Sequence, residues 1–196
     1  MTQPKPTVFL DRDGTISEEA GYLNHEDRLK LIPVCAEAIK LLNKNNIQTV
    51  VVTNQAGVAR GYFDEELLKK ILKKMENELE KEGAHLDKIY YCPHHPNVGP
   101  EKYRKDCNCR KPKTGMIDMA KQDLPIDFAK SYMIGDRISD IYFGKMIGVK
   151  SILVLTGYGK GEYTYQREQW KTQPDFIAEN ILDAVKWILK DLGINI

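Results

Sequence analysis

The sequence has no long hydrophobic run and almost no excess of charge of either sign. No apolar stretch approaches the ~20 residues that a membrane-spanning helix needs, and residues 1–6 lack the apolar core of a signal peptide. Lysine and arginine number 29 against 28 aspartates and glutamates, which leaves a net charge of +1. Because nucleic-acid and membrane-surface binders usually carry a larger basic excess, we expect a cytoplasmic protein that binds neither.

Cysteine is also scarce, with four residues in a chain of 196. Three of the four fall within residues 92–109, and the absence of a secretory signal argues against disulfides. A chain of this length can bury most of its apolar surface in one core, so its stability requires neither disulfides nor oligomerisation. We therefore expect a single domain over residues 1–196, acting as a monomer.

Short apolar runs rich in β-branched or aromatic residues alternate with longer amphipathic patterns. Each run predicts a strand buried on both faces, as in a parallel sheet. The predicted strands cover residues 7–10, 48–53, 89–92, 131–134 and 151–155. Helices are predicted over residues 34–45, from an N-cap at Asp64 through Leu79, and over 179–192. This alternation predicts an α/β fold, a three-layer sandwich around a mostly parallel, Rossmann-like sheet.

Two segments do not fit the alternation. Residues 93–112 are irregular and polar, and loops of this length without periodicity are usually functional or held by a cross-link. Residues 157–170 are aromatic and charged, and we interpret them as a surface excursion without an assigned function.

Three predicted strands end in polar residues able to act on a phosphate group. Asp11 and Asp13 follow the first, Thr53 and Asn54 end the second, and Asp136 follows the fourth. The carboxyl ends of strands are where open α/β sheets bind ligands. Two carboxylates two residues apart point to one side of an extended segment and favour different protonation states, which suits a nucleophile and a general acid. The alternative for this pair is an ordinary Asx turn at a strand end.

The motif DRDGT at residues 11–15 resembles the first motif of the haloacid dehalogenase (HAD) superfamily. The other motifs follow in order at Thr53, at Lys111, and at residues 135–136 with Asp140. The resemblance implies the HAD fold, an Asp11 nucleophile that accepts a phosphoryl group, and Thr53 and Lys111 holding the phosphate oxygens. Lys113 is a competing candidate for the lysine.

The same resemblance implies a Mg²⁺ site and an acid–base residue. Asp13 would protonate the leaving oxygen and then activate water. Mg²⁺ would be bound by Asp11, Asp136 and the main-chain carbonyl of Asp13. Asp140 is expected to support the metal end of the site, with a helix N-cap as the alternative.

A second set of metal ligands lies in the loop over residues 92–109. Three cysteines and one histidine form the pairs C-x-H and C-x-C, a Cys₃His set typical of a closed, structural Zn²⁺ site. The predicted ligands are Cys92, His94, Cys107 and Cys109. The alternative is three unrelated loop cysteines and a surface histidine. Since the loop ends at Arg110 and Lys111, we hypothesise that the metal helps to position both.

Only residues 14–52 separate Asp13 from Thr53, which leaves no room for a separate cap domain. The site should therefore be open, rimmed by loops, and suited to an extended polar substrate. A second phosphate on that substrate would need cations, and Arg110, Arg137 and Arg60 lie near the predicted rim. Each of these arginines could instead be an ordinary surface residue.

Within the superfamily, three stretches are similar to phosphatases that remove the 7-phosphate of D-glycero-D-manno-heptose 1,7-bisphosphate. They are residues 21–22, 53–61 and 92–111. This resemblance implies a small phosphorylated sugar as substrate and a role for Arg110 at the retained phosphate. It also implies that the sugar is lined by Glu19, Ala20, Gly21, Tyr22, Thr53, Asn54, Gln55 and Ala56. Arg137 stands where lysine is frequent in that family, so its contact could differ.

Two alternatives remain at this point. Histidinol-phosphate phosphatases share the aspartate motif and the metal loop, but they have an acidic residue at the position of Ala56, which would suit a cationic substrate. A non-catalytic, zinc-stabilised binding module would be expected to have lost a nucleophile, acid or lysine, whereas Asp11, Asp13, Lys111 and Asp136 are all present.

Overall fold

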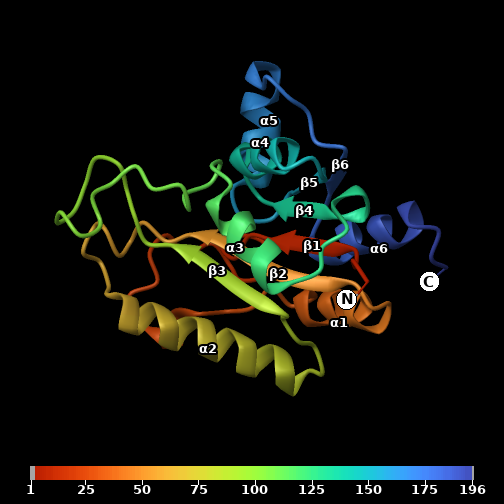
Figure 1. The fold of residues 1–196 in the computed structure, drawn as a ribbon, viewed down its shortest axis with the longest axis horizontal. Coiled ribbons are helices and arrows are strands. Elements are labelled where there is room, and N and C mark those ends of the chain that lie inside the picture. The colour runs from red at the N-terminus through yellow and green to blue at the C-terminus, as the bar shows by residue number, and fades with distance from the viewer. Residues whose placement is uncertain (1–2, 196) are drawn as a thin grey trace.

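A six-stranded parallel sheet forms the centre of the computed structural model, which describes residues 3–195 (Figure 1). The strands are β1 (Thr7–Leu10), β2 (Gln48–Asn54), β3 (Lys88–Cys92), β4 (Tyr132–Gly135), β5 (Lys150–Val154) and β6 (Phe176–Ala178). Their order across the sheet is β3-β2-β1-β4-β5-β6, and each neighbouring pair is parallel. The predicted fold class is confirmed, and the first five strands match their predicted positions to within one residue.

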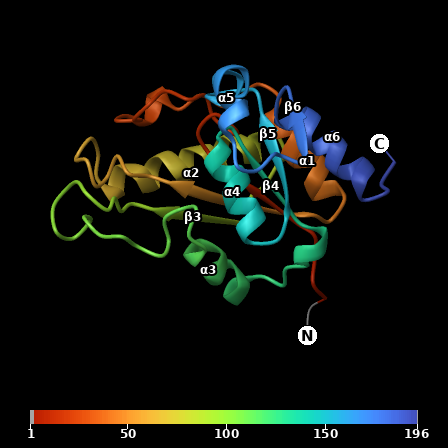
Figure 2. The same ribbon diagram turned by 90° about the horizontal axis from the view of Figure 1, so that it is seen from above.

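Helices cover both faces of the sheet. One face packs against α1 (Cys35–Lys44), α2 (Glu65–Lys81) and α6 (Ile181–Asp191), and the other against α3 (Gly115–Asp123) and α4 (Ile138–Met146). Figure 2 shows α3 on one side of the sheet and α1 with α2 on the other. Strand β1 shows why the sheet has an apolar core on each face, because successive strand residues point to opposite faces. Val8 and Leu10 belong to the hydrophobic cluster that contains α1, α2 and α6, and Phe9 belongs to the cluster that contains α3 and α4.

Several elements differ from the sequence-based expectation. Strand β3 is at the sheet edge, so the prediction that every strand is buried on both faces is wrong for it: Lys88 is exposed, and Ile89 and Tyr91 are half-buried. Strand β6 is not among the predicted strands, since three residues carry no periodic signal. Residues 157–170, expected to be a surface excursion, are mostly exposed and contain two helices that the sequence did not predict. These are α5 (Gly159–Gln166) and the 3₁₀ helix η3 (Arg167–Gln169).

The start of α2 agrees with the prediction from the sequence. The Asp64 carboxylate accepts a hydrogen bond from the Leu67 amide at 2.8 Å, which satisfies one of the free N–H groups of the first turn. Cys35 lies in the core, 1% exposed, as its position on an apolar helix face predicts. Within residues 3–195, no helix combines the length and the apolar character needed to cross a membrane.

The register of the sheet brings the polar strand ends together. Leu10 of β1 pairs with Val51 of β2 and with Ile134 of β4, so the residues that follow these strands meet at one edge. Between β1 and β2 the chain forms only the 3₁₀ helix η1 (Glu26–Arg28) and α1, and the 3₁₀ helix η2 (Phe128–Lys130) precedes β4. No other helix or strand covers this edge from within residues 11–47.

Candidate active site

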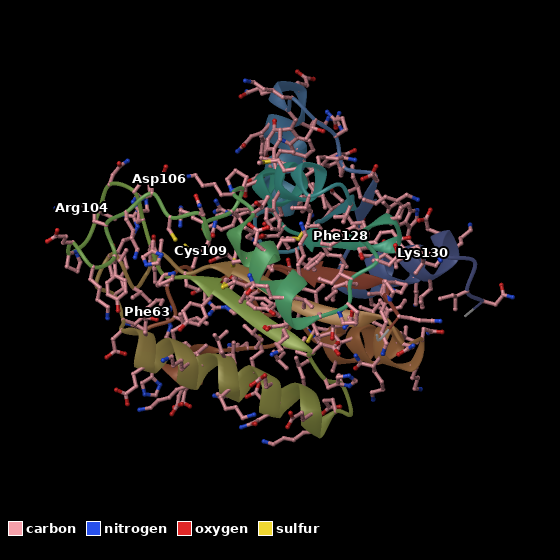
Figure 3. The ribbon with its side chains drawn as sticks, viewed as in Figure 1. Phe63, Arg104, Asp106, Cys109, Phe128 and Lys130 are labelled. Atoms are coloured by element: carbon pink, nitrogen blue, oxygen red, sulfur yellow. The ribbon has the colours of Figure 1, made fainter. Side chains whose placement is uncertain are left out.

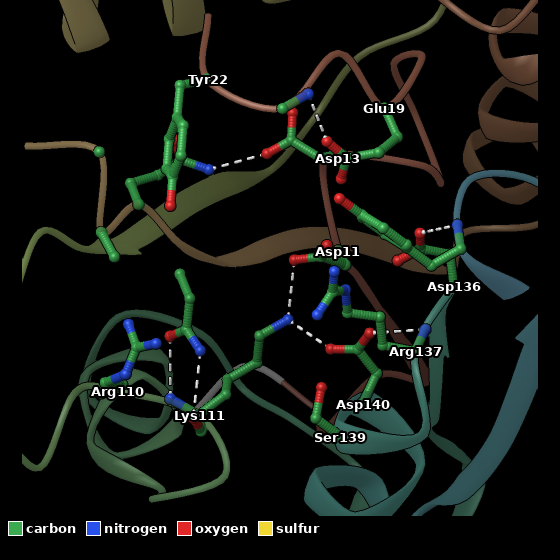
Figure 4. Close-up of a pocket in the computed structure, with 16 residues that line it drawn as sticks. Asp11, Asp13, Glu19, Tyr22, Arg110, Lys111, Asp136, Arg137, Ser139 and Asp140 are labelled. Carbon is green, nitrogen blue, oxygen red and sulfur yellow. Dashed lines mark hydrogen bonds and ion pairs between the residues drawn. The ribbon is translucent and has the colours of Figure 1, made fainter. Parts of the chain in front are cut away.

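A cavity of about 450 Å³ lies at the carboxyl ends of β1, β2 and β4 (Figure 4). Its walls come from the loops that follow these strands, from the residues just before α3, and from the start of α5. The predicted site residues in its walls are Asp11, Asp13, Glu19, Gly21, Tyr22, Asn54, Gln55, Ala56, Arg110, Lys111, Asp136, Arg137 and Asp140. Residues more than 100 positions apart in the sequence therefore share one site.

Lys111 is buried between two carboxylates. Its Nζ lies 2.8 Å from Oδ1 of Asp11 and 2.6 Å from Oδ1 of Asp140, and the residue is only 6% exposed. Burial alone would lower the pKa of Lys111, but Asp11 and Asp140 raise it, so the amine stays protonated. The Asn54 side chain holds the Lys111 backbone through hydrogen bonds of 3.0 and 3.1 Å, one in each direction. A fixed ammonium group therefore faces Asp11, as phosphate binding requires.

Carboxylate oxygens of Asp11, Asp136 and Asp140 lie within 4.8 Å of one another. Burial and the negative charges of Asp11 and Asp140 raise the pKa of Asp136 to about 8, and burial is the main reason that the pKa of Asp140 is raised to about 6. Three carboxylates against one lysine leave an excess of negative charge in a buried place. This oxygen-rich, under-neutralised set fits a hard divalent cation such as Mg²⁺.

The position of Asp136 is fixed by two glycine-containing loops. Its Oδ2 accepts a hydrogen bond of 2.8 Å from the backbone N–H of Tyr158. Gly14 has a φ of +72°, and a Cβ there or at Gly157 would collide with the Asp136 carboxylate. The Thr156 hydroxyl donates to the Gly14 carbonyl and ties the two loops together. Only glycine permits this close approach.

Asp13 is oriented by donors from two directions. Both of its oxygens accept hydrogen bonds from the buried Arg12 guanidinium, at 2.6 to 3.0 Å, and Oδ2 also accepts one from Nε2 of Gln55 at 3.0 Å. Asp13 remains part of the cavity wall, so its carboxylate is held in place beside the substrate space.

Four residues that sequence reasoning assigned to the site or its rim do not line the cavity. Thr53 is 1% exposed beneath Gln55, and its hydroxyl accepts a hydrogen bond of 3.0 Å from Nε2 of Gln55. Ala20 is turned toward Arg28, from which its carbonyl accepts a bond of 3.3 Å. Arg60 contacts His95 at 3.3 Å, and Lys113 pairs with Asp106. The expected roles of Thr53 and Ala20 at the substrate remain predictions.

Two wall residues were missed by sequence reasoning, Ser139 and Tyr158, while a third, Gly57, falls within the predicted stretch 53–61. Tyr158 could have been found from the tendency of open α/β sheets to bind ligands at the carboxyl ends of their strands, since residues 155–158 directly follow β5. The stretch after that strand is aromatic and resembles a surface segment, so the sequence predicts no ligand role there.

The loop after β3 brings the predicted Cys₃His set together. Sγ of Cys109 lies 2.9 Å from Sγ of both Cys92 and Cys107 and 3.4 Å from Nδ1 of His94. The four donor atoms lie within 4.8 Å of one another, so this group could hold a metal ion. Figure 3 shows Arg104, Asp106 and Cys109 along this loop, which extends beyond the end of the sheet. His95 is turned toward Arg60 instead, as the C-x-H spacing predicts.

Comparisons with known proteins connect this site to an enzyme family. A family model described as HAD-hydrolase-like matches residues 108–184. D-glycero-beta-D-manno-heptose-1,7-bisphosphate 7-phosphatase of Photorhabdus laumondii is 46% identical over 159 residues, covering 80% of this chain and 84% of the relative. The Haemophilus ducreyi protein of the same name is 40% identical over 94% of this chain and 98% of its own length. The chain belongs to the heptose-bisphosphate phosphatase family.

Solved structures agree with this assignment. The D,D-heptose 1,7-bisphosphate phosphatase of B. bronchiseptica, complexed with magnesium and phosphate, superposes with a TM-score of 0.83 at 29% identity. The match covers 95% of this chain and 99% of that one. Members of the heptose-bisphosphate phosphatase family are phosphoric monoester hydrolases of the HAD type, which use Mg²⁺. The enzyme interpretation is confirmed over the non-catalytic binding module.

The raised pKa of Asp136 predicts a destabilised site in the metal-free protein. An acid whose folded pKa lies above its unfolded value of 3.8 makes the folded state less stable as pH rises between the two values, here up to about 8. Without divalent metal at pH 8, Asp136→Asn should therefore be more stable than wild type and melt at a higher temperature, because asparagine brings no negative charge into the buried site.

Thermal melts of both proteins with EDTA at pH 5, 6, 7 and 8 measure this difference, which should shrink toward pH 5. Added Mg²⁺ should raise the Tm of wild type more than that of Asp136→Asn. A variant that melts below wild type at pH 8 would contradict the prediction.

Proposed function

We propose that this chain removes the 7-phosphate of D-glycero-β-D-manno-heptose 1,7-bisphosphate and releases the heptose 1-phosphate. The observation that carries this proposal is a single cavity that unites Asp11, Asp13, Lys111 and Asp136 in a chain related over nearly its full length to phosphatases of that name. The β anomer follows from the names of these relatives.

The reaction proceeds in two displacements on Asp11. In the first, an Asp11 oxygen attacks phosphorus, the bond from phosphorus to O7 breaks, and Asp13 donates its proton to O7. In the second, Asp13 takes a proton from water, the water oxygen attacks phosphorus, and the bond to Asp11 breaks to release inorganic phosphate. Arg12 and Gln55 keep the Asp13 carboxylate at the cavity wall through both steps.

Charge on the transferred group is met by Lys111, whose ammonium lies 2.8 Å from the Asp11 oxygen. When bound, Mg²⁺ would stabilise the negative charge on the phosphate oxygens and offset the mutual repulsion of the carboxylates. Asp11, Asp136 and the main-chain carbonyl of Asp13 would hold it. Asp140 stays with Lys111 and the Arg137 amide, to which it is hydrogen-bonded at 2.6 and 3.2 Å.

The sugar and its second phosphate would occupy the outer part of the cavity. Glu19, Gly21 and Tyr22 line it from the loop after β1, and residues 54–56 line it from the end of β2. Arg110 donates a hydrogen bond of 3.2 Å to the His94 carbonyl, which orients its guanidinium for the retained phosphate. Zn²⁺ at the four Cys and His ligands would fix the loop that carries Arg110.

Substrate preference tests the proposal directly. Mg²⁺-dependent phosphate release should be measured from both anomers of heptose 1,7-bisphosphate and from histidinol phosphate. We expect kcat/KM for the β bisphosphate to exceed that for histidinol phosphate by about 100-fold or more, or roughly 2.7 kcal/mol. Ala56 offers no carboxylate to the cationic histidinol, whereas Arg110 and Arg137 offer charge to a second phosphate.

Two other outcomes would change the assignment. If the enzyme prefers the α anomer, the proposed 7-phosphatase reaction stands, but the proposed β configuration at C1 of the substrate is wrong. Faster hydrolysis of histidinol phosphate than of either bisphosphate would overturn the proposed substrate.

A further inference from the structure

Arg137 enters the cavity with its guanidinium stacked on an aromatic ring. Its Cζ lies 3.8 Å from the centroid of the Tyr158 ring, and both residues line the cavity wall. Figure 4 shows the Arg137 side chain reaching from the start of α4 toward the middle of the site. No carboxylate within residues 3–195 lies close enough to its guanidinium to form an ion pair. The guanidinium thus lies over a ring face and has no directly paired carboxylate.

Tyr158 is itself anchored by the structure around it. Its backbone N–H donates to Asp136 at 2.8 Å, and the neighbouring Gly157 permits this close approach. Four residues later, the Glu162 carboxylate accepts a hydrogen bond of 2.7 Å from the Ile138 amide, which ties α5 to the start of α4. The backbone of Tyr158 is therefore held beside the same short segment that carries Asp136 and Arg137.

Stacking and ion pairing have different consequences for a guanidinium group. A carboxylate partner would occupy its N–H donors, whereas a ring face beneath the plane leaves the donors at the edge free. A lysine ammonium could also lie over the ring, but it has neither a plane to stack on the ring nor a fixed fork of donors at the edge of that plane. The side chain of Arg137 also lies between the two walls of the cavity: burial raises the pKa of both Glu19 and Asp136, and the charge of Arg137 opposes the rise at each.

We propose that Tyr158 is a positioning residue that holds the Arg137 guanidinium, with its donors free, toward oxygen atoms of the substrate. Arginine at position 137 is then preferred over lysine only while Tyr158 is present. The inference rests on the proposed function for the identity of the substrate, and it concerns binding rather than the phosphoryl-transfer steps.

A double-mutant cycle on KM for heptose 1,7-bisphosphate tests this role. Tyr158→Ala keeps the backbone N–H that holds Asp136. Because Tyr158 and Arg137 are both exposed, it should raise KM by about 2- to 5-fold, the range of a cation–π contact at an exposed site. The change in kcat and in the Mg²⁺ concentration for half-maximal activity should be within about twofold. In an Arg137→Ala background, Tyr158→Ala should have no further effect on KM. Arg137→Lys should likewise raise KM in wild type but not beside Tyr158→Ala.

Two further variants separate the ring from the helix. Tyr158→Phe should rescue KM, because the Tyr158 hydroxyl makes no hydrogen bond within residues 3–195. Tyr165→Ala, on the same helix and 83% exposed, is the matched control and should leave both constants unchanged.

Four results would count against one of the two proposals. An unchanged KM in Tyr158→Ala, or an equal effect with and without Arg137, would overturn the inference. A fall in kcat with a higher Mg²⁺ requirement would also overturn it, because Tyr158 would then act through Asp136. Absence of bisphosphate turnover in wild type would instead overturn the proposed function, and it is measured first.

Discussion

Asp11→Asn is expected to reduce phosphate release by on the order of 10⁴-fold or more, as loss of a covalent nucleophile does in other hydrolases. Asparagine keeps the shape of the side chain but offers a neutral amide in place of the oxygen that attacks phosphorus. The fold should be intact, because Lys111 retains its 2.6 Å ion pair with Asp140 and no core contact changes. Steady-state phosphate release and a far-UV CD spectrum measure the two parts of this expectation.

Asp118→Asn is the matched control for this substitution. Asp118 lies exposed on α3, outside the cavity wall, so the same chemical change there should leave turnover at the wild-type level.

Incubation of wild type with substrate and rapid acid quenching should trap phosphate on the protein, and Asp11→Asn should trap none. Asp11→Asn that turns over substrate at the wild-type rate would show that another group attacks phosphorus.

The strands were predictable because their signal is local. The runs that became β1, β2, β4 and β5 are mostly apolar and buried over most of their length, as expected of strands covered on both faces. The residues at their carboxyl ends, and those that directly follow, form the site. Parallel strands share one carboxyl edge, so Asp11 and Asp136 could be expected to meet without knowledge of any distance.

Helix α4 shows why other elements were not predicted. Four of its nine residues are buried, namely Asp140, Ile141, Phe143 and Gly144. This mixture of polar, apolar and glycine residues gives no helical periodicity of hydrophobic positions in the sequence. Residues 159–166 lack a stripe for the opposite reason: within α5 only Gly159 is buried. Such helices are specified by their tertiary neighbours, which a single sequence does not display.

The contacts of Arg12 and Asp140 depend on the fold in the same way. Sequence reasoning assigns Arg12 no role beyond its place in a motif, and it assigns Asp140 to the support of the metal. In the folded chain Arg12 is 1% exposed and binds Asp13, while Asp140 is an ion-pair partner of Lys111. Lys111 and Asp140 are 29 positions apart, and no spacing rule connects them.

Among substitutions outside the cavity, those at the Cys and His cluster are expected to change kcat and Tm the most. The segment from Pro93 to Lys111 contains no helix or strand, and its regular pairing is limited to one isolated bridge between His95 and Arg104. Within the segment, the Tyr103 hydroxyl donates a hydrogen bond of 2.8 Å to Glu65, which also accepts one of 3.1 Å from Tyr91 of β3. The four ligands join Cys92 and His94 to Cys107 and Cys109, so a metal bound there would cross-link the two ends of the loop.

Cys109→Ser should remove the metal and uncouple the loop from the site. Cys109 is closest to the other three ligands and lies two residues before Lys111, whose ammonium must stay near Asp11. Loss of a structural metal from the loop should lower the Tm, because the free energy of metal binding contributes to the stability of the folded chain. A displacement of Lys111 by ~1 Å would lower kcat by about 100-fold.

Metal content by atomic emission, a thermal melt and kcat at a temperature well below the melt measure these three effects separately. Cys35→Ala is the matched control: this cysteine is buried in α1, away from the cluster, so its loss should reduce Tm modestly while one Zn²⁺ per chain and kcat are retained. Zinc added back after chelation should restore the kcat of wild type but not of Cys109→Ser. Metal-free Cys109→Ser with the kcat of wild type would contradict the coupling, because Lys111 would then be positioned by Asn54 and its carboxylate partners alone.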